Sequence, residues 1–145
     1  MKSSVTLLFL LILVSCGQKI SETDIGKLNG YWEIEKVIFS DGKAKEYPMN
    51  ESFDYIQIKE KKGFRKKVIP QLNGRFLTTN QSEEIQVVFE NGTAFINYST
   101  PYAKWKEEIK TITSDRLILV NLSNVNYYYK KAGPINLTEN GKETK

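Results

Sequence analysis

Turn signals recur at close spacing along this chain, and this spacing limits what the chain can fold into. Several are dipeptides that favour two-residue hairpin turns, in which two antiparallel strands are joined directly. Segments between such turns are long enough for strands but short for most helices. The turn signals are Asp41-Gly42, Lys62-Gly63, Asn73-Gly74, Asn91-Gly92, Ser114-Asp115 and Ser123-Asn124. The chain is therefore predicted to form a series of antiparallel hairpins.

The segments between the turns carry the residue pattern of strands. Ile85, Val87 and Phe89 alternate with polar residues, which is typical of a strand with one buried face. No segment after residue 15 shows a sustained helical period. The predicted class is all-β, an up-and-down antiparallel meander of 8 to 9 strands that closes, fully or partly, into a barrel. We expect strands over 31–40, 53–60, 64–69, 71–79, 83–90, 93–98, 105–113, 116–122 and 125–131.

Residues 1–15 have the proportions of an export signal. Lys2 follows the amino terminus, and an apolar run covers 5–14. A membrane-spanning helix needs about 20 apolar residues, so this run is too short to act as the anchor itself. We interpret residues 1–15 as a signal peptide that is removed after export.

The sequence Leu13-Val14-Ser15-Cys16 ends this segment and resembles the bacterial lipobox. The resemblance implies cleavage before Cys16, acylation of its thiol and stable attachment to a membrane. Gly17 in the next position implies sorting to the outer membrane of a Gram-negative cell envelope. The alternative is an ordinary cleaved signal in which Cys16 occurs by chance.

Polar segments flank the predicted strands on both sides. Residues 16–27 are mostly polar and are predicted to form the lipidated N-terminus and a flexible tether, in which Ser21, Thr23 and Asp24 are suited to cap a short helical turn. Residues 132–145 are polar and contain proline and glycine, which predicts a C-terminal tail without a fixed structure. The barrel domain is thus expected over 28–131.

Four segments of the predicted barrel resemble the lipocalin-like domains of secreted lipoproteins of the Bacteroidetes type. Gly30-Tyr31-Trp32 stands where lipocalins carry the motif G-x-W on their first strand. The resemblance implies that Trp32 packs across the closed end of the barrel and that Lys130 or Lys131 lies over its ring. The chain departs from lipocalins because it lacks disulfides and a helix after the last strand. The four segments are 28–32 (LNGYW), 74–76 (GRF), 112–119 (ITSDRLIL) and 127–130 (YYYK).

The resemblance also implies a small, mainly apolar ligand bound at the mouth of the barrel. Six aromatic residues are candidates to line such a pocket: Trp32, Phe76, Phe95, Tyr98, Trp105 and Tyr127. The same rings fit plain core packing, since a barrel of about eight strands can be filled by its own side chains. Two functions therefore stand side by side. One is a membrane-anchored module that binds a small apolar ligand, and the other is a filled barrel that docks onto an envelope protein partner.

Composition excludes several other functions. The chain has no histidine, and Cys16 is its only cysteine, so the commonest general base, the usual zinc ligands and intramolecular disulfides are missing. No convergent polar cluster stands out in the sequence, and we expect no enzyme activity, no catalytic residues, no metal site and no cofactor. The net charge of +4 is too small to indicate a nucleic-acid partner. The basic stretch 59–67 is interpreted as a solvated strand edge guarded by lysines, with anionic lipid headgroups as the alternative contact.

Overall fold

The computed structural model describes residues 17–133, and most of these residues lie in strands. The predicted signal peptide, the lipidation of Cys16 and the tail from residue 134 lie outside the described residues. Within 17–133, no helix is long and apolar enough to cross a membrane. The elements are the 3-10 helix η1 (Glu22–Leu28) and the strands β1 (Gly30–Ile38), β2 (Ala44–Glu46), β3 (Phe53–Lys59), β4 (Lys62–Pro70), β5 (Phe76–Glu90), β6 (Thr93–Ser99), β7 (Lys104–Ile112), β8 (Arg116–Asn121) and β9 (Asn126–Lys131).

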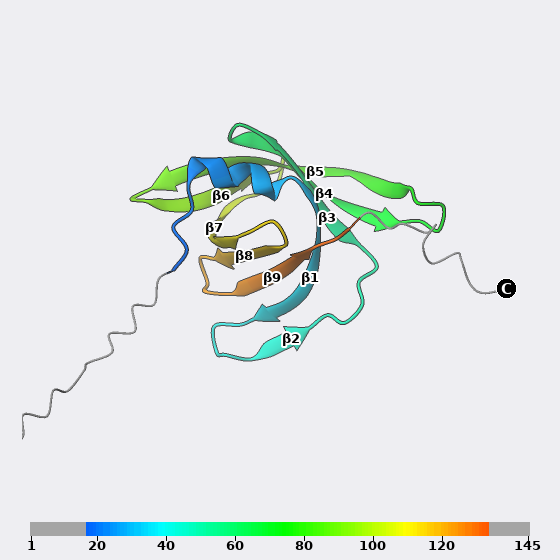
Figure 1. Cartoon of the computed structure of the whole chain (residues 1–145), viewed down its shortest axis with the longest axis horizontal. Coiled ribbons are helices and arrows are strands. Elements are labelled where there is room, and N and C mark those ends of the chain that lie inside the picture. Colours follow the sequence, from blue (N-terminus) through cyan, green and yellow to red (C-terminus); the bar gives the residue numbers. More distant parts are fainter. Residues whose placement is uncertain (1–16, 134–145) are drawn as a thin grey trace, which may run out of the picture.

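The strands follow one another around a single sheet, in the order β2-β1-β3-β4-β5-β6-β7-β8-β9. The last strand returns to the first, because β1 pairs with β9 from Trp32, opposite Lys131, to Ile38, opposite Asn126. This pairing closes β1 and β3–β9 into a barrel of 8 strands, with β2 as an extra strand on β1 (Figure 1). Every adjacent pair is antiparallel, which confirms the predicted all-β up-and-down meander.

One long strand replaces two that the sequence pattern predicts. β5 runs without interruption from Phe76 to Glu90, where separate strands are expected over 71–79 and 83–90. The chain turns earlier: the backbone N–H of Gly74 donates to the carbonyl of Gln71 at 3.0 Å. The polar residues at 79–82 imitate a turn in the sequence, but the strand continues through them beside β4, across a register shift. All three residues of β2 are exposed and show no alternation, which explains why the pattern misses this strand.

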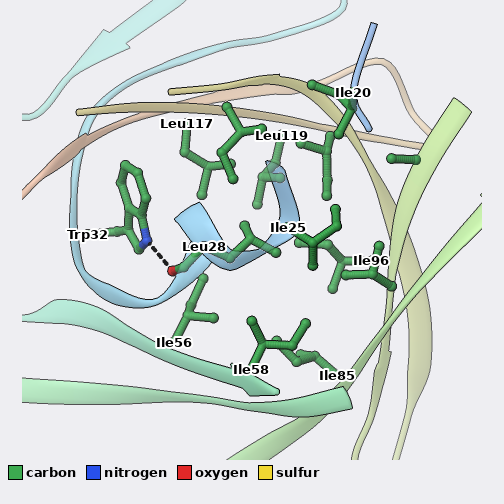
Figure 2. Packing of buried hydrophobic residues seen from close by; sticks show 14 of the residues in the cluster. Ile20, Ile25, Leu28, Trp32, Ile56, Ile58, Ile85, Ile96, Leu117 and Leu119 are labelled. Carbon is green, nitrogen blue, oxygen red and sulfur yellow. Dashed lines mark hydrogen bonds between the residues drawn. The ribbon is translucent and has the colours of Figure 1, made fainter. Parts of the chain in front are cut away.

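Alternate residues along the strands point into the barrel and build an apolar cluster near one end. Trp32 belongs to this cluster, is fully buried, and donates a hydrogen bond from its indole nitrogen to the carbonyl oxygen of Leu28 at 2.7 Å (Figure 2). The Nζ atom of Lys131 lies 4.3 Å from the centroid of the Trp32 ring. The basic residue that the family resemblance implies over this ring is therefore Lys131.

Helix η1 closes this end of the barrel. It contacts both β3 and β7, which are separated in the sheet by β4, β5 and β6, so the helix crosses the opening from one wall to another. Ile25 and Leu28 point inward from η1 and join the apolar cluster, together with Ile20 just before the helix (Figure 2). The backbone N–H of Ser21 donates to Oδ2 of Asp24 at 2.9 Å, which confirms the predicted helix cap.

The predicted flexible tether over 16–27 is wrong from Gln18 onward, because this segment is held by the barrel. The side chain of Gln18 makes two hydrogen bonds to the backbone of Ile112: Oε1 accepts from the N–H at 2.9 Å and Nε2 donates to the carbonyl at 2.8 Å. Ile20, two residues further on, is buried. The polar composition of the segment conceals this docking, since three well-spaced apolar residues are enough to bury one face of a short helix.

We expect Gln18→Ala to lower the free energy of unfolding by about 1 kcal/mol, because two hydrogen bonds to Ile112 are lost and the backbone groups of Ile112 turn to water. Urea unfolding followed by tryptophan fluorescence measures the change. Lys19→Ala is the matched control, because Lys19 is exposed and the hydrogen bonds to Ile112 are made by the adjacent Gln18. Equal stability of the two variants would contradict the docking of this segment.

Candidate ligand-binding site

The interior of the barrel changes from apolar to charged toward the end opposite η1, which we call the open end. On β3 the inward residues run from Ile58 through Ile56 to Asp54, and on β7 they run from Ile109 to Glu107. Asp54 is 4% exposed and Glu107 is 8% exposed. Since burial of an isolated charge is strongly unfavourable, these carboxylates require partners inside the barrel.

Arg65 of β4 is the main positive partner. It lies opposite Glu83 of β5 in the strand register, and its Nε donates a hydrogen bond to the Glu83 carboxylate. The carbon at the centre of its guanidinium group is 4.4 Å from the centroid of the Tyr98 ring, a cation–π contact. Its Nη1 is 3.5 Å from the Tyr98 hydroxyl and 4.0 Å from Oε2 of Glu107. Arg65 thus connects three walls of the barrel.

Further side chains extend this arrangement around the barrel. Lys67 of β4 forms an ion pair with Asp54, with 2.7 Å between Nζ and Oδ1. Burial raises the pKa of Tyr98 and of Tyr129 well above the usual phenol range, so both hydroxyls remain neutral donors at physiological pH. We call Asp54, Arg65, Lys67, Glu83, Tyr98, Glu107 and Tyr129 the interior polar network.

Glu107 is the least satisfied member of the network. Within the described residues, its Oε2 atom is buried and accepts no hydrogen bond. Burial raises the pKa of the Glu107 carboxyl, while Tyr98 and Arg65 act in the opposite direction. The interior of the barrel therefore favours the protonated form of Glu107 more than water does.

We expect Glu107→Gln to raise stability at pH 8, by about 1 kcal/mol, because an amide keeps the shape of the side chain without a buried charge. The pKa of Glu107 is higher in the folded state, so the folded chain holds this proton longer. Stability should then fall as pH rises from the unfolded pKa near 4.5 through the folded pKa. Urea unfolding between pH 4 and 8 should show a flatter profile for Glu107→Gln. Glu108→Gln, at the neighbouring outward position, should keep the wild-type dependence of stability on pH. The same pH dependence for Glu107→Gln and the wild type would contradict this expectation.

A cleft of about 820 Å³ lies at the open end, against one side of the interior polar network. Its volume falls in the range of small-molecule sites, roughly 300–1,000 Å³. Its walls come from β3, β4, the first half of β5 and the connection between β6 and β7. The charged residues that line it are Asp54, Arg65, Lys66, Lys67, Glu83 and Glu84.

Four of the six predicted pocket residues point into the barrel, but they do not line this cleft. Trp32 is in the apolar cluster near the closed end, and Tyr127 packs against that cluster from β9. Tyr98 and Trp105 stack on each other, with ring centroids 5.0 Å apart and an interplanar angle of 9°. This pair also borders a second, more open hollow of about 760 Å³.

The remaining two predicted pocket residues are on the outside of the barrel, so the prediction that all six line one pocket is wrong. Phe95 alternates with the inward-facing Ala94 and Ile96 on β6, and Lys106 lies over its exposed face. Phe76 stacks on Tyr31, with 4.4 Å between ring centroids, and Tyr31 faces away from its buried neighbour on β1. Their hydrophobicity favours a place in a pocket, but the alternation of side chains along a strand points both rings outward.

The sequence interpretation missed the charged residues of the network, although strand parity carries a signal for them. Asp54 continues the inward alternation of Ile56 and Ile58, and Glu107 continues that of Ile109. Arg65 falls within the basic stretch 59–67, which was interpreted as a solvated edge; its side chain is only 15% exposed. Among residues 17–133, no three His, Cys, Asp or Glu side chains come together so that they could hold a metal ion.

Comparison with known proteins places this barrel in a family. The protein-family model of the lipocalin-like domain matches residues 28–119. A solved lipocalin-like protein from Bacteroides uniformis is 12% identical, with a TM-score of 0.47, and the match covers 74% of this chain and 100% of the other. An uncharacterized protein from Bacteroides eggerthii is 11% identical, with a TM-score of 0.46, and the match covers 72% of this chain and 99% of the other. No curated protein matches. Because the family model covers more than half of the sequence, the chain belongs to the lipocalin-like domain family.

Proposed function

We propose that this chain is a lipoprotein of the bacterial cell envelope, a membrane-tethered binding protein that holds a small ligand at the open end of its barrel. The observation that carries the proposal is the cleft of about 820 Å³ beside the interior polar network. The ion pairs of Arg65 with Glu83 and of Lys67 with Asp54 hold the side chains at its base in place, and such preorganisation favours binding. The lipocalin-like fold supports a ligand but does not name one.

The N-terminal segment supports a defined orientation on the membrane. Gln18 is bound to Ile112, in the wall of the barrel near η1, and Cys16 precedes it by only two positions, with Gly17 between them. Two extended residues span at most about 7 Å. An acylated Cys16 would therefore keep the end closed by η1 beside the bilayer, and the cleft would open toward the aqueous side.

The character of the cleft changes the expected ligand. The family resemblance favours a mainly apolar molecule, whereas charged side chains from β3, β4 and β5 line the observed cleft. The apolar part of the interior is occupied by the chain's own residues, including Ile25 and Leu28. The ligand that we propose therefore carries polar groups.

A filled barrel that docks onto an envelope protein is the second candidate. The observation that favours it is a set of apolar side chains on three strand connections away from η1: Leu72 is 93% exposed, Tyr102 is 96% exposed and Leu122 is 76% exposed. A protein partner that covers these side chains would remove their apolar surface from water. A bare barrel with a stable protein partner would favour this candidate over ligand binding.

We expect the full chain, expressed in a Gram-negative host, to lose membrane attachment when Cys16 is replaced by serine, since acyl chains provide the binding energy. Intact-mass spectrometry of the wild-type protein from the membrane fraction should show cleavage before Cys16 and added acyl mass. Ser15→Ala is the control, because it keeps a small residue before the cysteine and should preserve acylation. A wild-type protein without acyl mass would contradict the proposed anchor.

Ligand binding is tested on the mature lipoprotein, purified in a non-ionic detergent from its own host. Native mass spectrometry followed by solvent extraction should reveal a small molecule at near-stoichiometric amount. Arg65→Lys should reduce the retained amount, since lysine cannot donate to Glu83 and contact Tyr98 with the same planar group. A protein that is bare under these conditions, and that co-purifies with an envelope protein, would favour the second candidate.

A further inference from the structure

One wall of the cleft carries neutral side chains that can donate and accept hydrogen bonds. This wall is formed by the residues 79–82 of β5, all of which are exposed. Within residues 17–133, the side chains of Asn80, Gln81 and Ser82 make no hydrogen bond. An amide offers both donors and an acceptor, and a hydroxyl does the same with one atom. The wall is therefore free to exchange hydrogen bonds with a ligand that both donates and accepts.

The charges in the cleft are already balanced. Asp54 is paired with Lys67 at 2.7 Å, and Glu83 is paired with Arg65. Three acidic residues and three basic residues line the cleft in total, so its formal charges cancel. An ionic ligand that approaches Asp54, Arg65, Lys67 or Glu83 would have to compete with an existing ion pair, whereas a neutral polar ligand leaves these pairs intact.

An aromatic ring stands at the rim of the same cleft. Tyr102 lines the cleft and is 96% exposed, so its ring has almost no contact with the rest of the chain. The turn that carries it is well held: the Thr100 hydroxyl oxygen accepts from the N–H of Ala103 at 3.0 Å, and the N–H of Thr100 donates to the carbonyl of Ala103 at 2.9 Å. A fixed turn with a free ring can place an apolar face against a ligand at low entropic cost.

We propose that the cleft binds a neutral, polyhydroxylated ligand of the saccharide class. The inference rests on the proposed function, since it specifies the ligand of that same cleft. Asn80 and Gln81 exchange hydrogen bonds with ligand hydroxyls, and Tyr102 packs against a face of C–H groups on the sugar ring. An aliphatic ligand would cover the amides of the wall without replacing their hydrogen bonds to water, which is unfavourable.

The test uses the mature lipoprotein in a detergent without a sugar headgroup. The protein is applied to an array of neutral, sialylated and sulfated oligosaccharides, and its binding of a fluorescent fatty acid is measured in parallel. We expect neutral glycans to be bound, with saturation-transfer NMR showing contact between sugar C–H protons and an aromatic ring. Asn80→Ala combined with Gln81→Ala should weaken this binding at least tenfold.

Two matched variants separate the contacts from general damage. Gln57→Ala removes an exposed amide outside the cleft and should leave saccharide binding unchanged. Tyr102→Ala should weaken binding several-fold, and Tyr102→Phe should restore it, because the ring and not the hydroxyl makes the contact. Both Tyr102 variants should keep the wild-type unfolding midpoint, since the side chain is exposed.

The outcomes distinguish this inference from the proposed function. Binding of the fatty acid, or of charged glycans alone, would overturn the saccharide class while a ligand-binding function stands. Failure to bind any neutral glycan would overturn it as well, and native mass spectrometry would then decide whether another small molecule is retained. If the protein is also bare in that experiment, the ligand-binding function falls together with the saccharide class.

Discussion

Gly63→Ala is expected to lower the free energy of unfolding by about 3 kcal/mol or more, although it adds a single methyl group. A Cβ atom on Gly63 would lie 1.9 Å from the carbonyl oxygen of Gln57 and 2.7 Å from the Cα of Ile58. Both are backbone atoms of β3, in which Ile58 lies directly opposite Gly63, and they cannot rotate away as a side chain does. The hairpin between β3 and β4 must therefore open or shift.

The effect should reach the candidate site as well as the fold. Arg65 follows Gly63 at the next inward position of β4, so a displaced hairpin moves the guanidinium group away from Glu83. Urea unfolding of the purified protein measures the loss. Gly26→Ala is the matched control, because a Cβ there meets nothing within 4 Å and alanine reduces the entropy of the unfolded chain, for a gain of about 0.5–1 kcal/mol. Equal stability of the two alanine variants would contradict this account.

The sequence predicted the architecture because two local signals agree along most of the chain. Turn dipeptides mark the ends of the hairpins, such as Asn91-Gly92 between β5 and β6, and alternation marks the buried face, as in Ile85 and Val87. The prediction failed where polar residues, which usually mark a turn or a loop, lie within a strand or a docked segment. The polar residues at 79–82 continue β5 across the register shift beside β4, and the polar segment before residue 28 docks because Ile20 and Ile25 are buried inside the barrel.

The site was harder to predict than the fold, for a physical reason. Aromatic chemistry alone does not say which face of a strand a ring occupies, because successive side chains point to opposite faces. A ring such as Phe95 packs on the outer surface of the barrel as readily as in its interior. Buried charges such as Arg65 and Glu107 are costly in isolation, and a single strand does not reveal their partners on other strands. Closure of the barrel brings Arg65 of β4 to Tyr98 of β6 and Glu107 of β7, and this is a tertiary property.

Arg65→Met is expected to lower the free energy of unfolding by about 3–5 kcal/mol at pH 7, because it leaves carboxylates without their positive partner inside the barrel. Glu83 loses the donor to its carboxylate, and Glu107 loses the nearest cation. Methionine fills a similar volume, so the loss reports charge more than packing. Arg75→Met is the control, since Arg75 is exposed in the turn before β5 and the substitution should change stability by less than about 0.5 kcal/mol.

The dependence on pH identifies the origin of this loss. Without Arg65, the folded-state pKa of Glu107 should rise further, so the folded chain binds more protons than the unfolded chain at mildly acidic pH. The deficit of Arg65→Met should therefore shrink as pH falls toward about 5, and adding Glu107→Gln should recover part of it at pH 7. If the loss of stability in Arg65→Met stays constant from pH 8 to 5, Arg65 stabilises the fold by packing and not by its charge. This result would also remove the electrostatic argument for a preorganised cleft, because Arg65 and Glu83 form part of its lining.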